Sequence, residues 1–322
     1  MAFALRLLHS QFIVKVPKPT TSFEGKTIII TGGNTGLGFE AAKYYLKLKA
    51  SRVILACRSL EKADKAKLEL EQTFAIRGDI VETWQVDLSS YASVIEFCEK
   101  AKTLPRLDVM LLNAGIMTKE YRVAEDNEST ITVNVISTFL MAFLIISKLK
   151  ETAKNFGTTP HMTIVSSDLH FLSDFSEWKS DDIFTLLNDK KTARMNDRYN
   201  VSKLMVILVV RHFVSLYGPN YPVIFNTVQP GWCQSSLSTE IATPFQKKIE
   251  NFMGRTTEEG ARSLVFATSF GKESHGKYVG NGGLLSESCF VTSKDGAAAG
   301  EKLWTQLSSK LERIRPNVMQ GC

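Results

Sequence analysis

The stretch that decides the fold of this chain is Thr31-Gly32-Gly33-Asn34-Thr35-Gly36-Leu37-Gly38. An apolar run, Ile28–Ile30, comes before it, and a helix-like stretch, Phe39–Lys49, follows it. Glycines spaced in this way between a strand and a helix make a tight turn, let the backbone approach phosphate oxygens, and let the helix pack closely on the strand. The helix N-terminus adds free N–H groups and partial positive charge. The stretch therefore predicts a nucleotide-binding loop, and a glycine-rich turn without a ligand is the alternative.

Composition indicates an ordinary globular protein. The chain has 322 residues, of which 44% are hydrophobic and 22% charged, enough to bury one large core. The net charge of +6 comes from basic residues dispersed along the chain, which argues against nucleic-acid binding. Five scattered cysteines without a Cys-x-x-Cys pair indicate reduced thiols in an intracellular, cytoplasmic compartment. The five scattered histidines have no metal-ligand spacing, so no metal site is expected.

The first residues form a separate amphipathic segment. Arg6, His9 and Lys15 interrupt the apolar pattern of Met1–Val16, which lacks the roughly 20 continuous apolar residues of a membrane span. A small-residue cleavage site of a secretory signal is also missing. We interpret residues 1–22 as an arm that packs on the following domain, without stable membrane insertion. A segment on the membrane surface is the alternative.

Short apolar runs alternate with longer amphipathic stretches over the rest of the chain. Continuous apolar strands separated by helices predict one doubly wound α/β domain over residues 23–322, with a parallel sheet covered on both faces. Ligands bind outside the carboxyl ends of the strands in such sheets. The expected strands are Thr27–Ile30, Arg52–Ala56, Ile80–Val86, Leu107–Leu112, Met162–Val165, Val223–Val228 and Tyr278–Val279. The expected helices are Phe39–Lys49, Leu60–Ala75, Tyr91–Lys102, Glu125–Lys154 and Asp197–Tyr217.

The residues after three of these strands suggest how a nucleotide would be held. Arg58 follows the second strand, where an acidic residue would favour NAD, and its guanidinium can grip the 2′-phosphate of NADP. Asp87-Leu88 ends the third strand, where a carboxylate can accept from an adenine amino group. Asn113-Ala114-Gly115 ends the fourth strand, and small residues there let the backbone approach a sugar or nicotinamide. The alternatives are a surface arginine paired with Glu61 or solvent, a helix N-cap at Asp87, and a plain turn at residues 113–115.

Tyr199 and Lys203 form the candidate proton-transfer pair. Their i, i+4 spacing puts both side chains on one face of a helix. A neighbouring ammonium stabilises a phenolate and lowers the pKa of the tyrosine, which makes it a usable general acid or base. Tyr45 and Lys49 have the same spacing, but Tyr45 lies roughly 13 Å along its helix from Gly36, away from the ligand edge, so this pair is rejected.

Two further polar residues complete a candidate site. Ser167 ends the fifth strand, where its hydroxyl can hydrogen-bond the reacting oxygen; a serine that caps the next turn is the alternative. Asn134 lies among apolar residues in a long helix-like segment. Its amide can hold a water beside Lys203, or it is a buried asparagine that braces the helix.

Taken together, these residues resemble the short-chain dehydrogenase/reductase superfamily over residues 24–312. The matching pieces are Thr31-Gly32-x-x-x-Gly36-x-Gly38, Asp87, Asn113-Ala114-Gly115, Asn134, Ser167, Tyr199-x-x-x-Lys203 and Pro230-Gly231. The start of the chain and the Cys57-Arg58 pair resemble the retinol-dehydrogenase-like branch, and the overall style is similar to fungal members that act in secondary metabolism.

The resemblance implies a catalytic tetrad and a nicotinamide cofactor, NADP(H). Tyr199 would move the proton and Ser167 would polarise the carbonyl. Lys203 would lower the tyrosine pKa and hold the nicotinamide ribose, and Asn134 would anchor a relay water. The glycine loop, Arg58, Asp87-Leu88, residues 113–115 and Pro230-Gly231 would bind the cofactor.

Three features depart from simple members of the family. A long insertion, Asp168–Arg198, separates Ser167 from Tyr199 and faces either the substrate or the surface. Ser166 precedes Ser167, so the catalytic serine is one of two, and we favour Ser167. Where many members have a threonine shortly after Pro-Gly, this chain has Trp232-Cys233-Gln234-Ser235, and Ser235 is the candidate substitute.

The expected function is an NADPH-dependent reductase of a ketone or aldehyde on a lipophilic small molecule, or the reverse oxidation, in a monomer or homodimer. A non-redox isomerase or cyclase on the same fold, and a regulatory protein that senses NADP, are the alternatives. The segment 232–253 is interpreted as a substrate lid or as a helix that packs on the core. Its apolar residues are Trp232, Leu237, Ile241, Pro244, Phe245, Phe252 and Met253.

Overall fold

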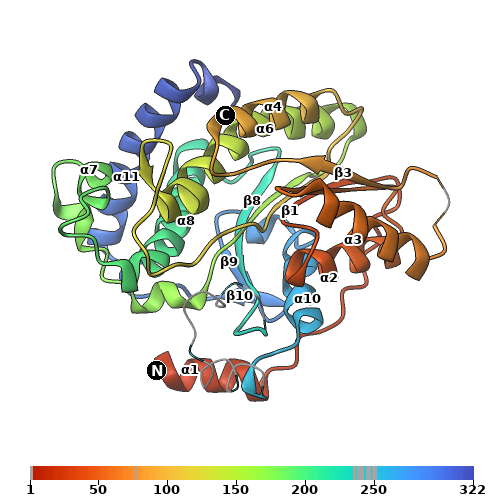
Figure 1. Cartoon of the computed structure of the whole chain (residues 1–322), viewed down its shortest axis with the longest axis horizontal. Helices are drawn as coiled ribbons and strands as arrows, with labels where there is room; N and C mark the ends of the chain where they lie inside the picture. The colour runs from red at the N-terminus through yellow and green to blue at the C-terminus, as the bar shows by residue number, and fades with distance from the viewer. Residues whose placement is uncertain (1–2, 77, 235–236, 238–242, 244–247, 249–251) are drawn as a thin grey trace.

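A mostly parallel sheet forms the centre of the molecule (Figure 1). The computed structural model describes residues 3–76, 78–234, 237, 243, 248 and 252–322. Within these residues the sheet has eight strands, and all adjacent pairs are parallel except β9 with β10. In spatial order the strands are β10 (Gly283–Leu285), β9 (Tyr278–Gly280), β8 (Ile224–Gln229), β7 (His161–Val165), β4 (Val109–Leu112), β1 (Thr27–Thr31), β2 (Arg52–Cys57) and β3 (Val81–Gln85). The doubly wound α/β fold is confirmed, and the antiparallel edge strand β10 was not predicted.

The strand order reverses between β1 and β4. From β1 the chain winds outward through β2 to β3, returns to β4 on the other side of β1, and continues through β7 and β8. Such a switch point leaves a crevice between the connections that leave the two strands. The glycine loop follows β1 and Asn113 follows β4, so both lie at this crevice.

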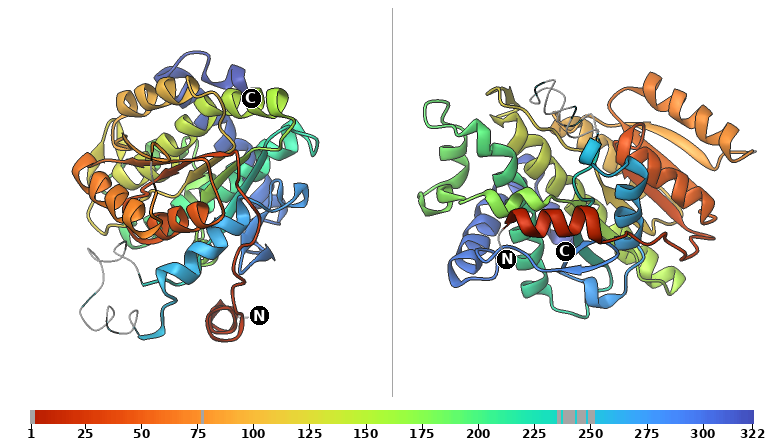
Figure 2. Two further views of the ribbon diagram at one scale, coloured as in Figure 1. Left: turned by 90° about the vertical axis from the view of Figure 1, so that its right-hand side faces the viewer. Right: turned by 90° about the horizontal axis from the view of Figure 1, so that it is seen from below.

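Helices cover both faces of the sheet (Figures 1 and 2). Face one carries α4 (Tyr91–Lys102), α6 (Thr138–Phe156), α8 (Met195–Tyr217) and α11 (Lys294–Ile314). Face two carries α2 (Gly36–Lys47), α3 (Leu60–Thr73) and α10 (Thr257–Ala267). Short helices at the periphery are α1 (Phe3–Leu8), η1 (His9–Ile13), α7 (Ile183–Leu187), η5 (Lys272–Ser274) and η6 (Val318–Gly321). Of the seven helices that cover the two faces, α10 and α11 lie outside the helical stretches expected from the sequence.

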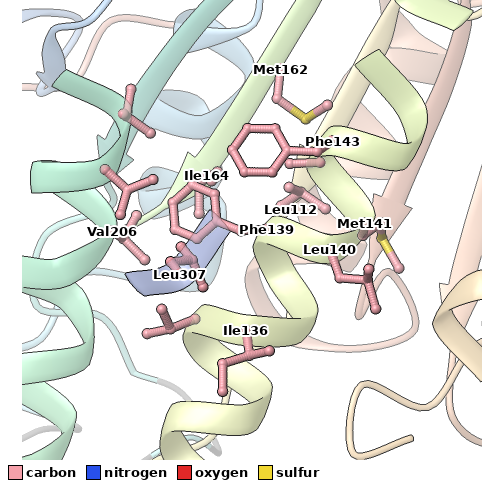
Figure 3. Close-up of a cluster of buried hydrophobic side chains, with 14 of the residues drawn as sticks. Leu112, Ile136, Phe139, Leu140, Met141, Phe143, Met162, Ile164, Val206 and Leu307 are labelled. Atoms are coloured by element: carbon pink, nitrogen blue, oxygen red, sulfur yellow. The ribbon is translucent and has the colours of Figure 1, made fainter. Parts of the chain in front are cut away.

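The strands alternate between two apolar cores. On β1, Ile29 belongs to the core of face one, whereas Ile28 and Ile30 belong to the core of face two, and all three are fully buried. Figure 3 shows the core of face one, where Phe139 and Phe143 of α6 stack with ring centroids 5.7 Å apart. Burial of apolar side chains on both faces explains why the strands are continuous apolar runs.

The predicted helix Glu125–Lys154 is wrong at its start. A two-stranded hairpin of β5 (Val123–Ala124) and β6 (Asn127–Glu128) comes first. Glu125 turns this hairpin with φ at +55°, a left-handed conformation that an α-helix cannot contain. The helical segment then runs through α5 (Ser129–Ile131), a π-helical turn η2 (Thr132–Ser137), and α6.

The insertion 168–198 is a packed module. It contains the 3₁₀ turns η3 (Asp168–Leu172) and η4 (Ser176–Lys179), and then helix α7. Phe175 and Phe184 are buried in the core of face one, and Trp178 packs against that core. Most of its aromatic residues therefore stabilise the fold, which differs from both expectations, a substrate-facing loop and a surface excursion. Phe171 is the exception, because it is partly buried beneath the guanidinium of Arg6 in α1.

Gly38 cannot be replaced without a local shift, because a Cβ at this position would overlap the carbonyl oxygen of Gly32. Gly38→Ala must push helix α2 off the loop, so we expect it to lower the free energy of unfolding by about 1–3 kcal/mol. Gly283→Ala is the control, since no heavy atom lies within 4 Å of its Cβ position. Denaturant unfolding of both variants tests the prediction, and equal stability of the two would contradict it.

Candidate active site

The glycine loop presents backbone N–H groups at the N-terminus of α2. Gly32 and Gly36 have φ of +65° and +56°, conformations that favour glycine, and the Cβ position of Gly36 faces open space. Thr35 is the N-cap residue, but its side chain makes no capping hydrogen bond. The first-turn N–H groups are therefore free of a side-chain cap, the arrangement that binds phosphate.

Behind the loop, Cys57 and Asn113 fix its position. The Cys57 sulfur accepts hydrogen bonds from the backbone N–H groups of Gly33 and Asn34, and burial raises the pKa of this thiol to about 11. The Asn113 amide donates to the carbonyl oxygens of Thr31 and Gly32, at 2.9 and 3.4 Å. Asn113 is therefore more than part of a turn, because its side chain ties the end of β4 to the glycine loop.

Residues 113–115 bring the backbone close to the candidate catalytic side chains. The hydroxyl oxygen of Thr31 accepts from the backbone N–H groups of Asn113 and Ala114, at 2.9 and 3.0 Å. A Cβ on Gly115 would lie 3.0 Å from Asn134 Oδ1 and 3.5 Å from Lys203 Nζ. Little room is left for a side chain at Gly115 beside these two residues.

Arg58 and Asp87 follow neighbouring strands at the same edge. Arg58 is exposed, and Glu61, its expected alternative partner, pairs with Lys65 at 2.6 Å. Asp87 Oδ1 accepts from the backbone N–H and hydroxyl of Ser89, whereas Ser90 is the N-cap of α4. The expected alternative for Asp87, a helix N-cap, is therefore wrong. Leu88 is buried in the core of face one, beside Asp87.

Ser167 and Tyr199 meet through their side chains. Tyr199 is buried in α8, and its phenol lies beside the Ser167 side chain. Burial raises the pKa of Tyr199, and the Ser167 hydroxyl opposes that shift. Ser166 points elsewhere, because its hydroxyl donates to the carbonyl oxygen of Lys203 at 3.0 Å. Of the two candidate serines, Ser167 is the one that contacts Tyr199, and it also accepts from Leu169 N as the cap of η3.

Lys203 lies one helical turn after Tyr199. Its ammonium nitrogen donates to the carbonyl oxygen of Val165 at 2.7 Å and lies 5.5 Å from the centroid of the Tyr199 ring. Burial lowers the pKa of Lys203 to about 8. The influences on the pKa of Tyr199 in this structure are burial and Ser167, and a lowering by Lys203, expected from the sequence, is not among them.

Asn134 braces two elements with its side chain. Its Oδ1 accepts from Ile116 N at 2.9 Å, and its Nδ2 donates to the Ile116 carbonyl oxygen and to Ser202 Oγ, at 2.9 and 3.1 Å. The carboxamide is thus engaged with protein, as in the bracing alternative. Asn134 lies in the π-helical turn η2, a distortion that often marks functional sites.

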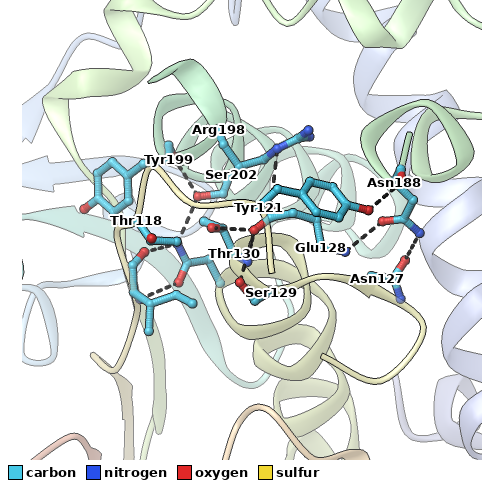
Figure 4. Close-up of polar contacts among 12 residues, drawn as sticks. Thr118, Tyr121, Asn127, Glu128, Ser129, Thr130, Asn188, Arg198, Tyr199 and Ser202 are labelled. Carbon is cyan, nitrogen blue, oxygen red and sulfur yellow. Dashed lines mark hydrogen bonds and ion pairs between the residues drawn. The ribbon is translucent and has the colours of Figure 1, made fainter. Parts of the chain in front are cut away.

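A buried ion pair that the sequence did not predict fixes the start of α8 (Figure 4). Arg198 directly precedes Tyr199, and its Nε lies 3.4 Å from Glu128 Oε2. Both side chains are nearly inaccessible, and burial lowers the pKa of Arg198. Glu128 Oε1 also accepts from the backbone N–H and hydroxyl of Thr130. The pair therefore connects the β6–α5 junction to the residue beside Tyr199.

His170 supports Ser167 from behind and was also not predicted. Its Nε2 accepts from the backbone N–H of Ser288 at 3.1 Å, so its Nδ1 must carry the proton donated to the Ser167 carbonyl oxygen at 2.7 Å. Burial lowers the pKa of His170 to about 4. Beside it, Tyr278 donates its hydroxyl proton to Asp168 Oδ1 at 2.8 Å, and burial raises the pKa of Asp168.

The turn after β8 closes the edge of the site. Gly231 has φ of +90°, and a Cβ there would lie 2.5 Å from the guanidinium of Arg255, which also contacts the Pro230 carbonyl oxygen. Of the expected lid, Trp232 and Met253 are partly buried, and Leu237 and Phe252 are exposed. Of the residues named for the lid, Ser235, Ile241, Pro244 and Phe245 lie outside the described residues.

The rejected pair, Tyr45 and Lys49, does not form a second site. Tyr45 is fully buried and hydrogen-bonds Thr268 at 2.8 Å, whereas Lys49 is exposed.

Comparison with known proteins identifies the family. The profile described as short chain dehydrogenase matches residues 26–158. The short chain dehydrogenase/reductase dmxR8 of Cryptosporiopsis sp. is 44% identical, over 97% of this chain and 98% of its own length. The short-chain dehydrogenase anuD of Penicillium roqueforti is 42% identical, over 98% of this chain and 85% of its own length. A crystal structure of NADPH-bound carbonyl reductase from chicken fatty liver shares the fold, with a TM-score of 0.61 at 17% identity over 82% of this chain and 100% of that one.

The chain therefore belongs to the short-chain dehydrogenase/reductase family, and it is similar to fungal members over nearly its full length. The retinol-dehydrogenase-like branch stays a prediction.

The buried His170 predicts a pH-dependent stability. An unfolded histidine titrates near 6.5. As the pH falls from 6.5 towards 4, the unfolded chain takes up this proton before the folded chain does. The free energy of unfolding therefore falls by up to about 1.4 kcal/mol per pH unit in that range. His170→Asn keeps a donor for the Ser167 carbonyl and removes the titration, so denaturant unfolding at pH 5 to 7 should show a shallower pH dependence.

The surface substitution His9→Asn is the control for this experiment and should keep the wild-type slope. Equal slopes for His170→Asn and wild type would contradict the assignment.

Proposed function

We propose that this chain is an NADP(H)-dependent oxidoreductase that interconverts a carbonyl and an alcohol on a lipophilic small molecule. The observation that carries the proposal is the meeting of Ser167, Tyr199 and Lys203 beside the glycine loop edge of the sheet. The three residues come from two parts of the fold: Ser167 follows β7, and Tyr199 and Lys203 lie one turn apart on α8.

Tyr199 is the proposed proton donor to a carbonyl oxygen. The Ser167 hydroxyl lies beside its phenol, so a substrate oxygen placed against both would receive one hydrogen bond from each hydroxyl. Because the phenol is buried, these hydrogen bonds act in a medium of low dielectric constant, where they are stronger than in water.

Lys203 is the proposed electrostatic partner of Tyr199. Its pKa of about 8 lies close to neutrality, so the ammonium can form and dissociate near physiological pH. We propose that its positive charge, 5.5 Å from the ring, favours the phenolate during the reaction, in addition to the burial and the Ser167 hydroxyl that set the pKa of Tyr199 in the structure. We propose that Asn134 positions α8 through its hydrogen bond to Ser202. A relay water beside Asn134 stays a proposal.

The residues of the glycine loop fit the phosphates of a dinucleotide. The uncapped N-terminus of α2 supplies backbone donors, and the open space at Gly36 admits a phosphate. Exposed Arg58 is the proposed ligand of a 2′-phosphate, and Asp87-Leu88 and Pro230-Gly231 would border the adenine and nicotinamide. The nicotinamide ring supplies or accepts the hydride when the cofactor is bound. The NADPH-bound carbonyl reductase of the same fold supports this choice of cofactor.

A lipophilic substrate is proposed from the apolar residues that follow β8. Trp232 and Met253 are partly buried at the two ends of the expected lid, and Phe252 is exposed beside them. The fungal origin of the relatives supports a role in fungal secondary metabolism. A cytoplasmic location, a state of monomer or homodimer, and the absence of a nucleic-acid partner belong to the same proposal.

Tyr199→Phe should abolish turnover of carbonyl substrates, at least a thousandfold, while leaving NADPH affinity within about twofold, because it removes the transferred proton and little volume. A panel of lipophilic ketones and aldehydes with NADPH, followed at 340 nm, measures the rate, and cofactor fluorescence measures the affinity. Tyr45→Phe is the matched control: it also removes a buried hydroxyl but should retain wild-type turnover.

Retained activity in Tyr199→Phe would rule out this tyrosine as the acid. Wild-type protein that binds NADPH but consumes none across the panel would favour an isomerase, a cyclase or a cofactor sensor.

Arg58→Ala should reduce the preference for NADPH over NADH by roughly tenfold or more, since one charge-assisted hydrogen bond contributes about 1.5–3 kcal/mol. Dissociation constants of both cofactors for the wild type and the variant test this prediction. Lys65→Ala, which removes an exposed cation from the following helix α3, should leave the ratio unchanged. An unaltered ratio in Arg58→Ala would refute the assignment of the 2′-phosphate site.

A further inference from the structure

The N-terminal arm is fixed to the body by one of its faces. Gln11 Nε2 donates to the carbonyl oxygens of Trp232 and Met253, at 2.9 and 3.0 Å. The buried guanidinium of Arg255 donates to the carbonyl oxygens of Ser10 and Val14. The arm is therefore not a loose tail, because its inward face is held at the residues that follow β8.

A second set of contacts holds the start of the arm. Arg6 stacks on the Phe171 ring, 4.3 Å from its centroid, and lies 3.9 Å from Asp168. Asp168 directly follows Ser167, so the arm runs from the residues beside the candidate catalytic serine to those beyond β8. Figure 2 shows helix α1 lying across this side of the molecule and projecting from the body.

The opposite face of the arm is apolar and exposed. Leu5, Leu8 and Phe12 follow one another at helical spacing, and Ile13 extends the stripe. Their exposed fractions are 59%, 46%, 57% and 69%. Phe252 is 90% exposed and directly precedes Met253, whose carbonyl oxygen accepts from Gln11 of the arm. We call Leu5, Leu8, Phe12, Ile13 and Phe252 the apolar stripe.

The charged side chains of the arm itself are all basic. Arg6, Lys15 and Lys18 lie in the arm, and the first carboxylate of the chain is Glu24. Lys15 and Lys18 are exposed. Glu258, the carboxylate near Lys18, is already paired with Arg262 at 2.6 Å. An apolar face bordered by cations matches the interface of an anionic lipid bilayer.

From these observations we infer that the arm docks the protein on the surface of an anionic membrane, with the apolar stripe inserted among the lipid head groups. The helical part of the arm that the structure describes, α1 and η1 over residues 3–13, is roughly 16 Å long, which is shorter than the roughly 30 Å of a hydrocarbon core. Among the described residues, two helical stretches are long and apolar enough to span, Ser129–Phe156 and Met195–Tyr217, and their apolar windows are wholly or mostly buried in the protein.

A second copy of the chain is a less suitable partner for the apolar stripe. Stable protein interfaces use about 20–30 residues on each side, whereas the stripe has five. Docking by the stripe would hold the side of the molecule that carries Ser167 towards the bilayer, where lipophilic compounds concentrate. Membrane binding is independent of the proposed redox activity, because it depends on the arm and not on Tyr199.

The test is flotation of the full-length protein with vesicles of phosphatidylcholine alone and of phosphatidylcholine with 30% phosphatidylserine. We expect the wild type to float with the anionic vesicles and to be released by salt. Leu5→Glu/Phe12→Glu should weaken the partition at least tenfold, because it places two carboxylates in the inserted face. Leu68→Glu is the matched control, since Leu68 is an equally exposed leucine on α3 and should behave as wild type.

A second variant, Lys15→Glu/Lys18→Glu, keeps the apolar stripe and reverses its charged border. It should weaken binding to anionic vesicles about fivefold or more for each cation and abolish the preference over neutral vesicles. NADPH fluorescence and circular dichroism should be unchanged in all variants. Wild-type protein that stays off anionic vesicles at low salt would overturn the proposal. A dimer in light scattering that Leu5→Glu/Phe12→Glu dissociates, without vesicle binding, would overturn it in favour of a second copy.

Discussion

The hydrogen bonds between Asn113 and Thr31 fix the geometry of the candidate site. They join the carboxyl ends of β1 and β4 at the switch point of the sheet, where the connections from the two strands diverge. The same amide also holds the carbonyl oxygen of Gly32, which Gly38 approaches so closely that no side chain fits. The carbonyl oxygens of Thr31 and Gly32 point towards Asn113 and accept its hydrogen bonds. The backbone N–H groups at the start of α2 are then available to bind a ligand.

Burial creates the chemistry of the candidate site at a cost in stability. Among the described residues, the ammonium of Lys203 donates a hydrogen bond to the Val165 carbonyl oxygen, and burial lowers the pKa of Lys203 to about 8. A buried ammonium beside a buried phenol is less favourable in a fold than two apolar side chains. The large apolar cores on both faces of the sheet offset this cost, which is typical of sites that sacrifice stability for function.

The features of the fold and of the candidate site that could be predicted are those with a local sequence pattern. The glycine loop, the parallel strands and the Tyr199–Lys203 spacing depend on neighbouring residues, and the structure contains all of them. The hairpin before α5 was missed because it depends on the left-handed backbone of Glu125, for which an acidic residue gives no signal. His170, Arg198 and Arg255 were missed because their partners are distant in sequence. His170, for example, hydrogen-bonds both the Ser167 carbonyl oxygen and the backbone N–H of Ser288, and no sequence pattern predicts such an arrangement.

Arg255 has a consequence for the order in which the chain can fold. Its guanidinium bonds to Asn281 and to the carbonyl oxygens of Ser10, Val14 and Pro230. Ser10 and Asn281 are 271 positions apart, so Ser10 leaves the ribosome long before Asn281 does. The arm is thus synthesised well before the residues that hold it in place. During translation its apolar residues remain available to chaperones, and contacts of such long sequence separation make this docking a late, slow step.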